Sequence, residues 1–345
     1  MIDWGAGYSA SWRVMIVDPD TWQDSEEMPY ISSASVERDC TDDCPLLESG
    51  TFQLDAPPDW ELPECWCRIE MLADQGGERE RHAIATLLAQ SSSGKAERGR
   101  LSVQAYGRSV LQPASDRKLL AGTYAPKGAN GGEYAASLLR QCTPAPVVVE
   151  GKFTLDDHVV FDAGSSYLEA AWAVLKAADW RMRVSGDGTI SIGPKPDTPV
   201  LELDRAHASL LVPGVDESWD VSEVPNRYCA VEGDAYAIAQ NDNPDSPISV
   251  PSRGRYVDVV DSSVTRVNGE TLEAYAQRRL AEESVITRER TYTREWWPDV
   301  SPFDVVRGSL SSAGLDGDMR VLTQSLECGK GIAVTEKAGK EESWL

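Results

Sequence analysis

LEAYAQRRLAEESV (residues 272–285) runs directly into ITRERTYTREWW (286–297). The first segment places apolar residues at helical spacing, and the second alternates along its length as a strand does. The chain then continues through a proline-bounded corner, a turn and two more alternating segments: PDVSPFDVVRG (298–308), AGLDGD (313–318), MRVLTQSLEC (319–328) and GIAVTEK (331–337). This order of helix, strand, corner, hairpin and strand predicts a sheet that forms part of a wall, and nothing in it resembles a catalytic pocket.

The size and composition of the chain set the class of protein. Its 345 residues are enough for two or three domains, and 41% of them are hydrophobic. No uninterrupted apolar stretch reaches the ~18 residues of a membrane-spanning helix. The opening MIDWGAGYSASW lacks the basic patch and apolar core of a secretory signal. We therefore expect a protein without a membrane segment that folds in a cytoplasm.

The charge of the chain is strongly negative, at −23 from 56 acidic and 33 basic residues. Binding to nucleic acid needs clustered lysine and arginine, so this balance argues against a nucleic-acid-binding protein. An acidic surface would, however, let DNA pass without holding it, because like charges repel. Plain solubility is the simpler explanation of the same charge.

The first part of the chain, residues 1–114, reads as short strands at turn spacing. Predicted strands lie at 12–17, 31–36, 50–54, 65–73, 81–88 and 100–106, with turns at 74–78 and 91–98. This pattern predicts a first, tube-like β-barrel domain.

Residues 115–200 have a different composition and predict a small α/β insert. A short helix is expected at 133–142 and a clearer one at 164–178. In the second helix, Ser166 and Glu169 have capping-box spacing. The helix leads into a hairpin that turns at Gly186-Asp187-Gly188.

Residues 201–336 return to strand patterns and predict a second tube-like β-barrel domain, with a flexible tail at 337–345. The predicted fold class is thus mainly β with an α+β insert, made of two β-barrels and a small helix-hairpin domain.

Candidate chemistry is sparse. Cys40, Cys44, Cys65 and Cys67 form the most suggestive cluster, because Cys65 and Cys67 would share one face of a strand. Four thiolates could bind Zn²⁺ or an iron–sulfur cluster if the loop around Cys44 folds over that strand. A disulfide is the second alternative. Ordinary free thiols are the default, since seven cysteines are an odd count and the usual C-x2-C spacing is absent.

No catalytic or cofactor-binding residue can be singled out. The three histidines, His82, His158 and His207, lack metal-ligand spacing, and no nucleophile motif is present. We therefore expect neither an enzyme nor a resident cofactor.

The order of these signals resembles the hub proteins at the distal end of bacteriophage tails, also called baseplate hub proteins. Three stretches carry the resemblance: SWRVMIVDPDTWQDSEEMPYISSASVERDCTDDCPLLESGTFQLDAP (11–57), YLEAAWAVLKAADWRMRVSGDGTISIGPKP (167–196) and RRLAEESVITRERTYTREWWPDVSPFDVVRGSLSSAGLDGDMRVLTQSLE (278–327). They lie at the start, middle and end of the chain.

The resemblance implies a homo-trimeric ring at the virion tail tip, assembled in the host bacterial cytoplasm. Each chain would supply two tube-like domains, so that three chains match a hexameric tail tube. The implied partners are the distal tail protein or tail tube, the tape-measure protein, and tail fibres or a spike, with DNA passing through the ring. The chain carries no appended wall-degrading domain, so hydrolase activity is not expected.

Two alternatives remain open within this resemblance. One is the distal tail protein, which forms a hexameric ring, and the other is a polysaccharide-binding or polysaccharide-degrading tail-tip protein. A free-standing cytosolic enzyme is a third, for which the sequence offers no site.

Overall fold

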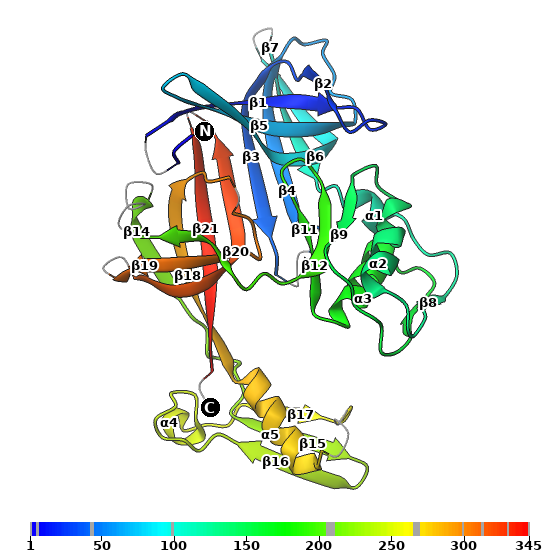
Figure 1. Ribbon diagram of the computed structural model, residues 1–345, viewed down its shortest axis with the longest axis vertical. Coiled ribbons are helices and arrows are strands. Elements are labelled where there is room, and N and C mark those ends of the chain that lie inside the picture. Colours follow the sequence, from blue (N-terminus) through cyan, green and yellow to red (C-terminus); the bar gives the residue numbers. More distant parts are fainter. Residues whose placement is uncertain are drawn as a thin grey trace. The chain divides into compact units, whose positions relative to one another are not determined.

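The computed structural model describes residues 2–4, 7–41, 45–97, 100–204, 211–264, 270–298, 300–311, 314–329 and 331–343 (Figure 1). The chain divides into two compact units. The large unit holds Met1–Val215 and Tyr292–Ala338, and the small unit holds Asp216–Thr291 and Gly339–Leu345. Within the described residues, no helix is both long and apolar enough to span a bilayer.

Seven strands form the first β region of the large unit: β1 (Ser9–Val17), β2 (Asp24–Glu27), β3 (Ile31–Asp39), β4 (Glu48–Ala56), β5 (Cys65–Gln75), β6 (Glu78–Glu97) and β7 (Arg100–Arg108). The predicted strands are present, and most are longer than expected. The predicted turn at 91–98 is wrong, because β6 continues through it and pairs with β7 as far as Glu97 opposite Arg100.

The insert packs helices against short strands. Its elements are α1 (Gln112–Asp116), β8 (Thr123–Ala125), α2 (Gly131–Arg140), β9 (Val147–Val149), β10 (Val159–Phe161), α3 (Tyr167–Lys176), β11 (Trp180–Val184) and β12 (Ile190–Pro194). The predicted capping box is confirmed: Ser166 Oγ accepts from the Glu169 backbone N–H at 3.0 Å, and Glu169 Oε2 accepts from the Ser166 backbone N–H at 2.6 Å.

The rest of the large unit is the second β region. It contains β13 (Pro199–Leu203), β19 (Val305–Leu310) and β20 (Leu315–Cys328). It also contains parts of three strands that continue into the small unit: β14 (Leu211–Ser218), β18 (Val285–Glu295) and β21 (Ile332–Ser343). Two boundaries differ from the sequence prediction. β20 begins inside the predicted turn, because Leu315 is buried opposite Leu310. β21 continues past Lys337, where a flexible tail was expected.

The small unit is a three-stranded sheet with one helix on it. Its elements are β15 (Arg227–Glu232), β16 (Ala235–Gln240), α4 (Val250–Arg253), β17 (Asp258–Asp261) and α5 (Leu272–Glu283). The strand order is β16-β15-β17. Tyr228, Ala237 and Ala239 of the sheet pack against Tyr275 and Leu280 of α5 in one apolar core.

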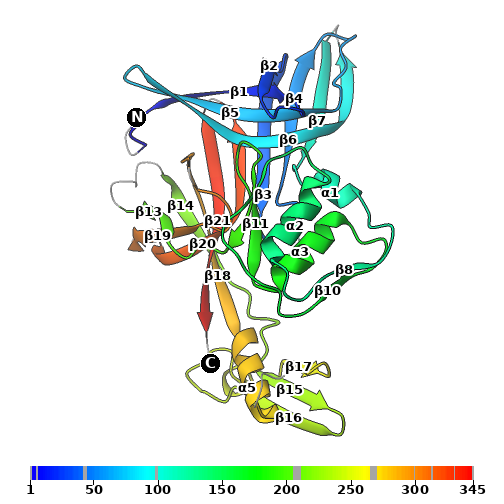
Figure 2. The same cartoon turned by 45° about the vertical axis from the view of Figure 1, so that its right-hand side comes forward.

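One sheet joins the two β regions of the large unit. Its described strands follow the path β14-β18-β21-β20-β3-β4-β7-β6-β5-β1-β2, with β19 beside β20 and β13 beside β19 (Figure 2). The antiparallel pairing of β20 with β3, in which Leu326 lies opposite Val36, is the seam between the regions. The predicted class, mainly β with an α+β insert, is confirmed. The described strands do not close into the two predicted barrels, because this seam draws them into one open sheet.

The core under the seam is also shared. Phe52, Leu54 and Ile69 of the first β region pack in the same buried cluster as Leu326 and Val334 of the second. Apolar burial therefore holds the two regions together as one unit.

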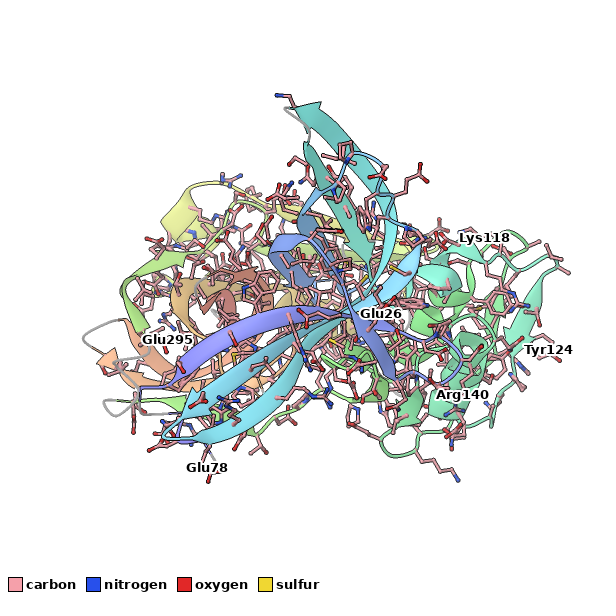
Figure 3. All side chains as sticks on the ribbon, turned by 90° about the horizontal axis from the view of Figure 1, so that it is seen from above. Glu26, Glu78, Lys118, Tyr124, Arg140 and Glu295 are labelled. Atoms are coloured by element: carbon pink, nitrogen blue, oxygen red, sulfur yellow. The ribbon has the colours of Figure 1, made fainter. Side chains whose placement is uncertain are left out.

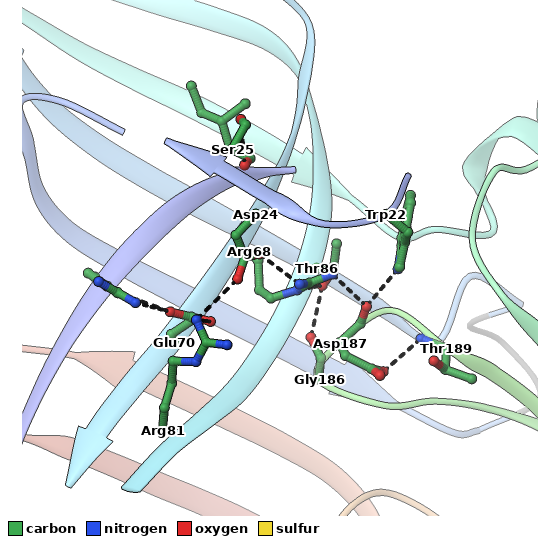
Figure 4. Close-up of polar contacts among 12 residues, drawn as sticks. Trp22, Asp24, Ser25, Arg68, Glu70, Arg81, Thr86, Gly186, Asp187 and Thr189 are labelled. Atoms are coloured by element: carbon green, nitrogen blue, oxygen red, sulfur yellow. Dashed lines mark hydrogen bonds and ion pairs between the residues drawn. The ribbon is translucent and has the colours of Figure 1, made fainter. Parts of the chain in front are cut away.

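The insert is fixed to the first β region by its hairpin turn (Figure 4). Thr86 Oγ1 donates to the Gly186 carbonyl oxygen at 2.9 Å. Trp22 Nε1 and Arg68 Nη2 donate to the Asp187 carbonyl oxygen at 2.9 and 3.1 Å. A Cβ on Gly186 would lie 1.9 Å from the Ala83 carbonyl oxygen, so only glycine allows this close approach.

A row of five buried polar side chains crosses the core-facing side of the joined sheet, with one residue on each of five neighbouring strands. The row consists of Arg294 (β18), Glu336 (β21), Gln324 (β20), Arg38 (β3) and Glu48 (β4). Arg294 donates to both oxygens of Glu336, at 2.9 Å from Nε and 2.5 Å from Nη2. Gln324 Nε2 donates to Glu336 Oε1 at 2.7 Å, and Arg38 Nη1 donates to Gln324 Oε1 at 3.3 Å. The Arg38 Nε atom lies 3.6 Å from Glu48 Oε2.

The pairing of Arg294 with Glu336 keeps both of these groups ionised. Burial alone would raise the pKa of Glu336, but the Arg294 charge and the hydrogen bonds hold it below its ordinary value. Burial likewise opposes the charged form of Arg294, yet Glu336 raises the Arg294 pKa further. A one-residue slip of any strand would move its member to the other face and leave its partners buried and unpaired, so the row specifies the register of the seam.

The Arg294–Glu336 pair gives the first testable prediction. Arg294→Met should lower the free energy of unfolding by about 3–5 kcal/mol, because it leaves the Glu336 carboxylate buried without its partner. The double variant Arg294→Met/Glu336→Gln removes both charges but keeps an acceptor for Gln324, and it should recover most of that loss. Urea denaturation followed by tryptophan fluorescence measures both values. If the single and double variants lose the same amount of unfolding free energy, the pairing of the two charges does not contribute to stability.

Candidate functional site

The opposite side of the joined sheet is the main candidate for a functional surface. We call it the polar face, and it is formed by alternate residues of six neighbouring strands, β18-β21-β20-β3-β4-β7. Its members are Thr293, Glu295, Thr335, Lys337, Thr323, Ser325, Glu327, Ser33, Ser35, Glu37, Ser49, Thr51, Gln53, Asp55, Ser102, Gln104, Tyr106 and Arg108. These residues are exposed or half-buried, whereas their neighbours in each strand point into the core.

Side chains on the polar face bond to one another across strands. The hydroxyls of Ser35 and Thr51 lie 2.8 Å apart, and those of Thr293 and Thr335 lie 3.0 Å apart. Ser325 Oγ donates to Glu37 Oε1 at 2.6 Å across the seam. These contacts tie the six side chains to the sheet across neighbouring strands.

The charge balance of the polar face is acidic. The carboxylates of Glu37, Asp55, Glu295 and Glu327 outnumber the cations, which among the described members are Arg108 and Lys337. Hydroxyl and amide groups make up most of the rest. A phosphate backbone would meet few cations here, so the polar face suits a surface past which a polyanion moves without binding.

Exposed side chains of the insert do not gather into a comparable surface. Figure 3 shows Lys118, Tyr124 and Arg140 spread over the surface of the insert rather than around one point. In the described part of the chain, no group of three or more His, Cys, Asp or Glu side chains is arranged to hold a metal ion. His207 and Cys44 lie outside the described residues.

The remaining cysteine candidates fall in two places. Cys65 and Cys67 lie on β5 with their Sγ atoms 3.6 Å apart, so the structure places them on one face of a strand as expected. Cys40 follows β3, and its thiol donates to the Val321 carbonyl oxygen at 3.5 Å. Burial raises the pKa of Cys40 to about 12, which keeps the thiol protonated. Cys40 packs with the core of the insert, whereas Cys67 lies in the core of the joined sheet.

The last member of the buried row, Glu48, is a carboxyl with a strongly raised pKa that borders a cavity. Burial raises its pKa to about 7, although the Arg38 charge acts in the other direction. Neither Glu48 oxygen accepts a hydrogen bond from a described residue. A cavity of about 20 Å³ lies against Glu48, Arg38 and Arg183.

Sequence reasoning missed both the polar face and the buried row, although the signal for each is present. Alternation such as Ser49-x-Thr51-x-Gln53 marks a strand with one hydroxyl-rich side. Arg38 then stands two residues from Val36, which is buried and apolar, and Glu48 stands in the same alternation as the buried Phe52 and Leu54. A charged residue at a core-facing position of a strand, where the alternation calls for an apolar side chain, indicates a buried partner.

Comparison with known proteins adds the class of fold. No family model and no curated protein matches the sequence. The tail protein from Neisseria meningitidis MC58 matches over 98% of each chain, with a TM-score of 0.66 and 16% identity. The 43 kDa tail protein of prophage MuSo2 from Shewanella oneidensis matches over 96% of this chain and 98% of its own, with a TM-score of 0.64 and 12% identity.

A third similar structure is a chain of the Francisella PdpA–VgrG complex, with a TM-score of 0.56 and 8% identity. The match covers 97% of the present chain and 58% of that one. The chain therefore has the fold of phage tail proteins, and the resemblance seen in the sequence is confirmed at the level of the fold.

Glu48 gives a pH-dependent prediction. Its pKa rises from 4.5 in the unfolded chain to about 7 in the folded one, so between these values the folded state binds more protons. The unfolding free energy should therefore rise, by an amount on the order of 3 kcal/mol, as the pH falls from 8 to 5. Glu48→Gln should remove this contribution. The variant should therefore be more stable than the parent chain at pH 8, and this difference in unfolding free energy should disappear at pH 5. Denaturation midpoints measured at both pH values test this, with Glu37→Gln as the exposed control. A constant difference between parent and Glu48→Gln across this range would contradict it.

Proposed function

We propose that this chain is a structural, non-enzymatic hub at the distal end of a phage tail, in which three copies form a ring around the channel for DNA and the tape-measure protein. The polar face of the joined sheet carries the proposal. It is a continuous surface that is hydroxyl-rich and acidic, and it is made by strands of both β regions.

The fold supports this role. Phage tail proteins share it over nearly the full length of the chain. We propose that residues 1–114 act as one tube-like region and residues 201–336, apart from the small unit at 216–291, act as a second, with 115–200 as the insert between them. Three copies would then present six such regions to a hexameric tube.

The charge supports the same role. A channel lined with clustered lysine and arginine would hold DNA by releasing its counterions, whereas an acidic lining repels it. The chain carries −23 overall, and its polar face follows the same sign. The proposed neighbours are the tail tube or distal tail protein on one side and fibres or a spike on the other, at a tail tip assembled in the host cytoplasm.

Reversing charge on the polar face tests the channel role. The double variant Glu37→Lys/Glu327→Lys should assemble into particles but slow DNA ejection about tenfold, because the new cations would hold phosphates. The slowing should shrink at high salt, since counterion release drives the contact. Ejection is measured by dye uptake of released DNA.

The matched control is Asp156→Lys/Asp162→Lys, which makes the same charge change at two exposed positions of the insert. It should leave ejection unchanged. Normal ejection by the Glu37→Lys/Glu327→Lys particles would contradict the channel role, and equal slowing by both double variants would assign the effect to total charge instead.

A further inference from the structure

The small unit has a sheet edge that differs from the usual protected edge. β16, with the sequence AYAIAQ, is an edge strand of the described three-stranded sheet, and it pairs with β15 over all six residues without a register shift. It contains no charge, no proline and no glycine. Natural edge strands are usually short, charged or bulged, because an open row of backbone donors and acceptors recruits other strands.

The opposite edge of the same sheet is protected in this usual way. β17 has four residues, and Asp258 and Asp261 occupy its two ends. Asp258 bonds to Arg227 at 2.7 and 2.8 Å, and Asp261 accepts from Tyr228 and Tyr275. The two edges of one small sheet are therefore built differently, and β16 is the open one.

β16 also exposes large apolar side chains. Ala237 and Ala239 face α5 and are buried, whereas Tyr236 and Ile238 point to the other side and are 69% and 53% exposed. In register, Tyr236 lies opposite Val231, and Ile238 lies opposite Cys229. A strand added beside β16 would bring its own alternate side chains against Tyr236 and Ile238.

Carboxylates stand at both ends of this edge. Asp234 precedes β16, and Asp242 and Asp245 follow it, and all three are exposed. An antiparallel second copy of β16, centred on Ile238, would place Asp234 of one copy opposite Asp242 of the other. Like charges opposite each other destabilise a strand pair, so this arrangement disfavours a second copy. It favours a strand with basic residues at both ends.

We propose that β16 is a docking edge for an extended segment of a different protein, with apolar residues at alternate positions and lysine or arginine on both flanks. The segment adds antiparallel or parallel to β16 as a fourth strand, and its flanking cations pair with Asp234, Asp242 and Asp245. This docking edge uses no residue of the polar face, so it stands or falls separately from the proposed channel role.

A synthetic peptide tests the docking edge on the full chain. The probe has two lysines at each end of a six-residue core in which valine or tyrosine alternates with threonine, and it carries a terminal dye. Fluorescence anisotropy should show saturable binding that weakens with salt. The same peptide with glutamate in place of lysine should bind about tenfold more weakly or not at all, because like charges then meet at both ends.

Two further comparisons identify strand addition. Ile238→Lys should weaken peptide binding about tenfold, since a charge on the edge strand blocks pairing. Val260→Lys, which makes the same kind of change at a still more exposed apolar residue on β17, should leave binding unchanged. Two further peptides are N-methylated, one at the odd and the other at the even positions of the core. One of these two methylation phases should abolish binding and the other should spare it, because only one set of peptide N–H groups faces β16.

Three results with the peptide would overturn the proposal. They are absence of peptide binding, equal binding to the parent chain and Ile238→Lys, and equal tolerance of both methylation phases. Concentration-dependent self-association that Ile238→Lys abolishes would also overturn it, by assigning the edge to a second copy of the chain. Circular dichroism of both lysine variants verifies that the fold is retained.

Discussion

The buried row from Arg294 to Glu48 is the constraint on which the joined sheet depends. Its members come from strands that lie far apart in the sequence, yet they meet as direct neighbours across the seam between β3 and β20. Apolar packing alone would tolerate a slip of two residues, which keeps every side chain on its own face, because many side chains of similar size line this core. A row of paired charges does not tolerate such a slip, since it would leave a charge buried in the core without its partner.

The register fixed by the row determines the character of the other side of the sheet. Side chains alternate along a strand, so holding Arg38 and Gln324 inward places Glu37 and Ser325 outward and opposite each other. The same logic extends along the six strands and yields the polar face. The proposed channel surface is thus a direct consequence of the buried pairing behind it, and the insert is held against the first β region by the glycine-dependent turn at Gly186.

The sequence predicted local elements well because their signals are local. The capping box at Ser166 and the hairpin at Gly186–Gly188 each depend on a few adjacent residues, and both are present. The pairing of β3 with β20 depends on residues nearly 300 positions apart, and nothing in single-strand alternation specifies it. For that reason two separate barrels were expected where one open sheet is found. The polar face could have been inferred strand by strand, but not its continuity across the seam.

The mass of the purified chain in solution, measured by light scattering over a range of concentrations, is the most direct test of the trimeric ring. One chain weighs 37.7 kDa. A ring built from three copies predicts a trimer, at about three times that mass. A hexamer would contradict it in favour of a distal ring, and a monomer at every concentration would contradict a ring that assembles from this chain alone.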